Sequence, residues 1–393
     1  MGGTVLHGAA ERGSKINALE SLRGLAAICV ALFHANFFTN FFIIQNAFIT
    51  FSFVMVDFFF VLSGFVISHA YWDRIGDFRD AAVFQVRRFL RLYPLHFMTL
   101  MVYVVIETMR LVAAWRYNLV YDDPAFGHNG IEGFFYNLVL LQGILPEKLS
   151  FNYPSWSISV EFFTYFLFAA IMVTLRSARS RIWLAVVIVI VSGVVLHVTG
   201  GSDDNTRLAL LRCIYAFFIG VLANRLWERT PASIWPFAAE VMLVLSVLSV
   251  IYLQRIPLQL HPLIFGLTIL SVCWSGRSPA RLLLESRPLV WLGTLSYGIY
   301  MWHAAVWWLL KNALQGMQFY IGVQVVEDGA RSGNLDMPFA ASCAFIVAGL
   351  AAIIALAWLS YRHVEMPIND YRHRIGRNAL GAQSPIARGE APR

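Results

Sequence analysis

The sequence carries few charged residues. Asp, Glu, Lys and Arg together make up 13% of its 393 positions, whereas an average soluble domain carries about 25%. Hydrophobic residues account for 58% of the chain. A composition so rich in apolar residues and so poor in charge excludes an ordinary soluble domain.

Cysteine and negative charge are scarce too. Four cysteines lie inside apolar stretches without paired spacing, which indicates neither a disulfide framework nor a zinc site, and we expect no metal. The 30 basic residues outnumber the 23 acidic ones, mostly through arginine at the ends of apolar stretches. That placement is a topology signal and does not indicate nucleic-acid binding. The first 16 residues have no apolar core, so we expect no cleavable signal peptide.

Apolar runs of roughly 18 to 22 residues recur along the whole chain, each long enough for a helix to cross a bilayer. They predict an all-α, polytopic integral membrane protein with about ten transmembrane helices. The predicted spans lie near residues 22–44, 48–69, 93–113, 156–175, 182–199, 207–227, 236–253, 258–275, 289–310 and 338–361.

Arginine clusters set the predicted orientation. The connection 71–92 is rich in arginine, so the positive-inside rule places it and the N-terminus in the cytoplasm. The apolar segment 134–145 is short of the roughly 20 residues that a span needs. We predict that this segment is re-entrant or interfacial, because the later basic clusters then also lie inside and both termini are cytoplasmic.

The predicted domain organisation has three parts. Residues 1–16 form a cytoplasmic segment, residues 17–366 the transmembrane domain, and residues 367–393 a basic disordered cytoplasmic tail. The tail is rich in Arg, Pro, Gly and Ala, a composition typical of disorder, and its charge favours anionic lipid.

The first apolar stretch contains two ionisable residues, Arg23 and His34. Eleven residues separate them, which is almost three helical turns, so both lie on one face about 16 Å apart along the axis. Ionisable groups are costly inside a membrane and mark function. We expect this pair to face one cavity.

Three further ionisable residues are predicted at a similar depth: Asp57, Glu161 and His303. Each is a candidate catalytic residue, and each has a structural alternative. Asp57 could hold an imidazole or an arginine in place, and His303 could make only an interhelical hydrogen bond.

Six motifs occur in order along the chain: Leu22-Arg23-Gly24-Leu25 with His34, Asp57-Phe58-Phe59-Phe60, Arg88-Phe89-Leu90-Arg91, Trp156-Ser157-Ile158-Ser159-Val160-Glu161, Leu295-Ser296-Tyr297-Gly298 with His303, and Glu365-Met366-Pro367. This ordered set resembles acyltransferase family 3, the multispan membrane O-acyltransferases of bacterial surface glycans and some small molecules. The resemblance covers residues 15 to 370.

The resemblance implies that Arg23 and His34 are essential for transfer and that Arg88 and Arg91 form a site for acyl-CoA. It predicts transfer of an acyl group, acetyl by default, from cytoplasmic acyl-CoA to a hydroxyl of a glycan or lipid-linked sugar. His34 would be the general base or a transient acyl carrier. The implied location is the bacterial inner membrane. The extra SGNH domain of some members is not expected here, since only a short tail follows the last predicted span.

Two other functions stay open from the residues alone. A proton-coupled transporter also places ionisable groups near the membrane midplane, but the sequence has no inverted repeat. Arg87, Arg88 and Arg91 have an alternative too, because cytoplasmic arginines can set the membrane topology without binding a ligand. A structural scaffold would not need the intramembrane charges.

Overall fold

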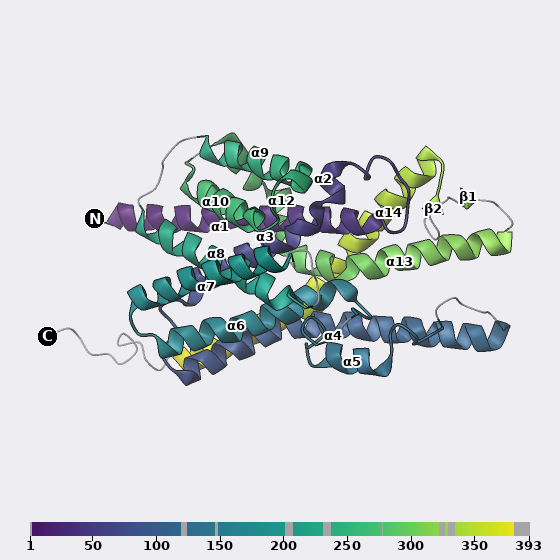
Figure 1. The fold of residues 1–393 in the computed structure, drawn as a ribbon, viewed down its shortest axis with the longest axis horizontal. Helices are drawn as coiled ribbons and strands as arrows, with labels where there is room; N and C mark the ends of the chain where they lie inside the picture. Colours follow the sequence, from purple (N-terminus) through teal and green to yellow (C-terminus); the bar gives the residue numbers. More distant parts are fainter. Residues whose placement is uncertain are drawn as a thin grey trace.

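The computed structural model describes residues 2–118, 124–145, 148–200, 207–230, 237–276, 278–321, 327–328 and 335–380. These residues form a bundle that is almost entirely helical (Figure 1). Its long helices are α1 (Gly2–Ala35), α3 (Met55–Tyr71), α4 (Phe78–Tyr117), α6 (Trp156–Thr174), α7 (Ala178–Thr199), α8 (Ala209–Arg229), α13 (Ser296–Ile321) and α14 (Phe339–Ser360).

Shorter elements connect the long helices. They are α2 (Ala47–Thr50), η1 (Ser52–Val54), α5 (Ile131–Leu138), η2 (Tyr153–Ser155), α9 (Ala238–Ile251), η3 (Leu253–Arg255), α10 (Leu260–Trp274), α11 (Pro279–Leu284), α12 (Arg287–Thr294), η4 (Tyr361–Glu365) and α15 (Met366–Leu380). One small antiparallel ribbon pairs β1 (Glu327–Asp328) with β2 (Leu335–Asp336).

Seven helical segments among the described residues are long and apolar enough to cross a membrane. The predicted all-α membrane architecture is therefore confirmed. Helices α9 and α10 coincide with two further predicted spans but have only 14 and 15 residues, fewer than the roughly 20 that a crossing needs. The count of ten and the orientation of the termini stay predictions.

The first predicted span ends earlier than expected. Helix α1 stops at Ala35 and not near residue 44, so His34 lies in its last turn. The apolar residues Phe41 and Ile44 beyond it are buried against the bundle within turns. Their hydrophobicity reflects core packing and not lipid contact, which a single sequence does not distinguish.

Helix α4 begins earlier than expected. Most of the predicted connection 71–92 is helical, because Asp77 caps the helix by accepting a hydrogen bond from the Asp80 backbone N–H at 2.8 Å. Arg88 and Arg91 are therefore held on a rigid helix. In the short apolar segment 134–145, helix α5 stops at Leu138, well below the length of a span, as predicted.

Helices α3 and α8 approach each other very closely. A Cβ added at Gly64 would lie 1.9 Å from the Phe217 carbonyl oxygen, and one at Gly220 would lie 1.9 Å from the Val61 carbonyl oxygen. Small residues at such crossings let helix backbones approach within a membrane protein. This contact fixes the centre of the bundle.

The C-terminal region differs from the predicted tail. Residues 366–380 form helix α15, which continues from α14 through the π-helical turn η4 and packs against α4. This corrects the expectation of disorder from residue 367, which rested on composition alone; residues 381–393 lie outside the described residues. Helix α15 and the start of α1 lie at the same end of the bundle (Figure 1).

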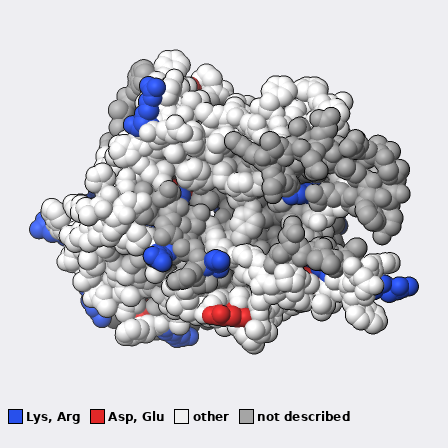
Figure 2. Space-filling model, turned by 45° about the vertical axis from the view of Figure 1, so that its right-hand side comes forward, with Lys and Arg blue, Asp and Glu red and all other residues white. Residues whose placement is uncertain are grey.

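The outer face is consistent with this architecture. On the face drawn in Figure 2, the Lys, Arg, Asp and Glu side chains of the described residues form a few scattered groups among white, uncharged side chains. Large apolar side chains are exposed along α7, where Val187, Ile190, Val191 and Val194 are each at least half exposed. Such a surface suits contact with lipid.

Candidate active site

Two predicted histidines meet in the structure. His34 comes from the last turn of α1 and His303 from α13, and His303 Nε2 lies 3.1 Å from His34 Nδ1. The two ring centroids are 4.7 Å apart. His303 is fully buried, whereas His34 keeps 9% of its surface exposed. Both histidines therefore lie in the interior of the bundle, and His34 is the less buried of the two.

Hydrogen bonding selects the tautomer of His34. Its Nδ1 lies 2.9 Å from the carbonyl oxygen of Val30. A carbonyl oxygen only accepts, so Nδ1 carries the hydrogen and the lone pair of neutral His34 is on Nε2. His303 Nε2 is then a second acceptor for the same N–H. The arrangement leaves His34 Nε2 able to take a proton or to attack a carbonyl carbon.

A cavity of about 430 Å³ is lined in part by Tyr300, whose ring packs against that of His303. Its charged lining comes from four arginines and two glutamates on α1, α4, α6 and α15: Glu20, Arg23, Arg88, Arg91, Glu161 and Arg372. The structure therefore brings together four of the predicted site residues, Arg23, Arg88, Arg91 and Glu161. Neither histidine is among the described lining residues.

Two of the four arginines in the cavity lining, Arg23 and Arg88, make specific side-chain contacts. Arg23 pairs with Glu20 at 2.6 Å and donates from Nε to the Ser296 hydroxyl at 2.7 Å. Arg88 donates from Nη2 to the Tyr71 hydroxyl at 3.1 Å, and its guanidinium lies 5.1 Å from that ring's centroid. Arg23 Nη2 also donates to the Gly293 carbonyl oxygen at 3.3 Å, so Arg23 is the more fully engaged of the two arginines.

Tyr300 connects the cavity lining to the histidine pair, and Ser157 is its hydrogen-bonding neighbour. Both residues line the cavity, and their hydroxyl oxygens are 2.8 Å apart. Tyr300 also donates to the Pro154 carbonyl oxygen at 2.9 Å, and its ring centroid lies 5.6 Å from that of His303. The histidine pair is thus one side-chain layer beyond the end of the cavity.

Comparison with known proteins identifies the family of this chain. The profile described as Acyltransferase domain matches residues 16–362. The chain belongs to acyltransferase family 3. This confirms the resemblance carried by the motifs.

Three relatives illustrate the similarity. The chain is 30% identical over 327 residues to YrhL of Bacillus subtilis (strain 168), by name a peptidoglycan O-acetyltransferase, across 74% of this chain and 48% of that protein. It is 25% identical over 387 residues to peptidoglycan O-acetyltransferase OatA of Listeria monocytogenes, across 90% and 56%. Acyltransferase MdmB of Streptomyces mycarofaciens is 34% identical over 119 residues, across 29% and 27%.

The chain spans about half the length of the first two relatives. No solved structure matches it.

Asp57 forms an ion pair with an arginine. Its two carboxylate oxygens accept from Arg212 Nε at 2.7 Å and Nη2 at 3.0 Å, and both residues are buried. A bidentate pair of this kind satisfies the carboxylate. The geometry favours the structural alternative for Asp57, in which it holds an arginine in place. Sequence reasoning had not singled out Arg212.

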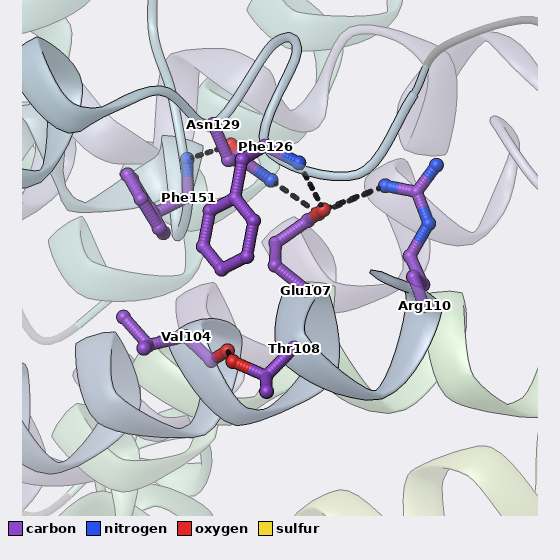
Figure 3. Close-up of polar contacts among 7 residues, drawn as sticks. All are labelled: Val104, Glu107, Thr108, Arg110, Phe126, Asn129 and Phe151. Atoms are coloured by element: carbon purple, nitrogen blue, oxygen red, sulfur yellow. Dashed lines mark hydrogen bonds and ion pairs between the residues drawn. The ribbon is translucent and has the colours of Figure 1, made fainter. Parts of the chain in front are cut away.

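Sequence reasoning also missed a buried glutamate near the far end of α4. Glu107 accepts hydrogen bonds from Arg110 at 2.9 Å, from the Phe126 backbone N–H at 3.0 Å and from the Asn129 amide at 2.8 Å (Figure 3). Asn129 in turn accepts from the Phe151 backbone N–H at 2.5 Å. We call Glu107, Arg110 and Asn129 the loop clamp.

The loop clamp holds two strained backbone positions near the active site. Phe126 and Phe151 have φ of 60° and 52°, a left-handed conformation that costs a residue with a side chain about 1–2 kcal/mol. Two residues after Phe151, the Tyr153 ring centroid lies 5.3 Å from that of His34. The clamp therefore helps to position the segment that packs against His34.

Proposed function

We propose that the protein is a membrane-bound O-acyltransferase that moves an acyl group, acetyl by default, from cytoplasmic acyl-CoA to a hydroxyl of a glycan or glycolipid. One observation carries the proposal: a histidine pair with a defined tautomer lies one side-chain layer beyond an arginine-lined cavity. The charged cavity suits a phosphate-bearing donor, and the histidines suit its reactive end.

The cavity supports the choice of donor. Arginine presents a planar fork that matches phosphate geometry, and Arg88 and Arg91 are one helical turn apart on α4. The phosphates would bind there, while the pantetheine arm would extend past Tyr300 toward His34. Because the positive-inside rule places residues 71–92 in the cytoplasm, the donor would enter from that side.

The chemistry assigned to His34 is general base catalysis. Nε2 removes the proton of the acceptor hydroxyl, the hydroxyl oxygen bonds to the thioester carbonyl carbon, and the carbon–sulfur bond breaks. The proton held on Nε2 then passes to the departing CoA thiolate. During the step His34 becomes an imidazolium, which its Nδ1–H stabilises by donating to Val30 and His303. In the alternative route Nε2 carries the acyl group transiently.

Relatives support a glycan as the acceptor class, because two of them are peptidoglycan O-acetyltransferases by name. The acceptor hydroxyl would meet His34 beside Tyr153, whose ring contacts that of His34. The location would be the inner membrane of a bacterium. We expect no metal to take part.

The proposal is tested in a strain that lacks the gene. Mass spectrometry of its surface glycans should show the loss of an acyl mass, which the parent gene restores and a His34→Ala variant does not. Purified protein in nanodiscs should release free CoA thiol from acetyl-CoA when an oligomer of N-acetylglucosamine is added, without any ion gradient. Unchanged glycan masses together with no thiol release would contradict the proposal.

A further inference from the structure

We infer that Arg372, on helix α15, binds a phosphate group of the donor together with Arg88 and Arg91. The inference rests on the proposed function and extends it to a residue beyond the last predicted span. Helix α15 packs against α4, so its Arg372 reaches the same cavity as the two α4 arginines. Asn369 on α15 and Tyr361 on η4 line the cavity beside it.

Arg372 has an unmet hydrogen-bonding requirement. Its Nη1 is buried and has no hydrogen-bond partner among the described residues. A buried donor without a partner costs about 1–3 kcal/mol, and more when it is charged. The same holds for Nε of Arg88. Two unsatisfied guanidinium nitrogens beside one cavity indicate that an acceptor-rich ligand belongs there.

The charge balance of the cavity favours an anion. Four arginines and two glutamates line it. One glutamate, Glu20, is already paired with Arg23 at 2.6 Å, and the other, Glu161, accepts from the Tyr165 hydroxyl at 2.6 Å. Two charged residues outside the lining offset each other: the Glu365 carboxylate attracts Arg23 and Arg91, and the Arg87 guanidinium repels Arg372. Two positive charges therefore remain in excess, which matches a phosphate or pyrophosphate group.

A donor that lacks the phosphates separates this role from a structural one. We expect Arg372→Ala to raise KM for acetyl-CoA at least tenfold, since a charge-assisted hydrogen bond contributes about 1.5–3 kcal/mol. With S-acetylpantetheine, which has no phosphate to contact, the variant should match the parent. The KM of Arg372→Lys for acetyl-CoA should fall between those of the parent and of Arg372→Ala. The matched control is Arg362→Ala, because Arg362 is exposed and lies over the Trp358 ring at 5.6 Å.

Each outcome decides the matter. An equal loss of activity with both donors would make Arg372 a structural residue and overturn the inference. A loss that is seen in nanodiscs of anionic phosphatidylglycerol but is absent in phosphatidylcholine would assign Arg372 to lipid binding and would also overturn it. If Arg88→Ala and Arg91→Ala discriminate between the donors and Arg372→Ala does not, the inference fails while the proposed donor stands. If the parent itself does not discriminate between the donors, the proposed donor fails.

Discussion

Replacing His303 should cost far less activity than replacing His34. His34 Nε2 is the proposed base, and a general base contributes about 10²- to 10⁴-fold to rate, so His34→Ala should lose at least that much. His303 supplies one of two acceptors for the His34 Nδ1–H, the other being the Val30 carbonyl oxygen at 2.9 Å. With that carbonyl still in place, the tautomer of His34 is kept.

The expected loss for His303 follows from that geometry. One neutral hydrogen bond has a net value of about 0.5–1.5 kcal/mol, which is about two- to tenfold in rate. The double variant His34→Ala/His303→Ala should be no worse than His34→Ala alone, because His303 acts through His34. Since His303 is fully buried, His303→Gln, which keeps polar atoms in the space, is measured beside His303→Ala.

The assay is the initial rate of CoA thiol release per folded protein, with folding followed by thermal unfolding in detergent. The matched control is His261→Gln, because His261 is another buried histidine whose two ring nitrogens both face backbone carbonyls. It should keep the parent rate. If well-folded His303→Gln is as inactive as His34→Ala, His303 itself is a proton carrier and the assignment of roles is wrong.

Three other residue sets give further predictions. Replacing Arg88 and Arg91 by lysine keeps the topogenic charge but loses the planar fork, so donor affinity measured by titration should fall about tenfold with acceptor dependence unchanged; parent affinity would make both residues topogenic. Asp57→Asn should lower the free energy of unfolding by about 3–5 kcal/mol, because it removes the carboxylate charge that compensates the buried Arg212 guanidinium; chemical denaturation measures this, and the double change with Arg212→Met should recover part of it. Glu107→Ala should raise protease cleavage within residues 124–130 while acetyl-CoA binding stays at the parent value; protection equal to the parent would mean that the loop does not depend on the clamp.

The sequence predicted those features of the fold that depend on local pattern. Apolar runs identified the long helices, and the spacing of Arg23 and His34 placed both on one face of one helix. Helix ends were harder to predict. A buried apolar turn such as the one around Phe41 has the composition of a membrane span, and a basic helix such as α15 has that of a disordered tail.

Pairings between distant residues could not be predicted in the same way. His34 and His303 are 269 positions apart, and Arg212 reaches Asp57 from a helix whose sequence gives no reason to choose that partner. These contacts exist because the bundle brings α1 to α13 and α3 to α8. Each residue could be singled out because an ionisable group is costly inside a membrane. Only the packing of the helices decides which of these groups pair with each other.

The positions of these pairings suggest why the charged and reactive parts of the site are separated. Arg23 and His34 are eleven residues apart on α1, which places the arginine level and the histidine level about 16 Å apart along the helix axis. That distance is about half of a hydrocarbon core of roughly 30 Å. The phosphates of a donor could therefore stay where arginines neutralise them, at the end of the bundle that holds α15. Only the uncharged pantetheine arm would then enter the apolar interior, so the cost of placing charge there is avoided.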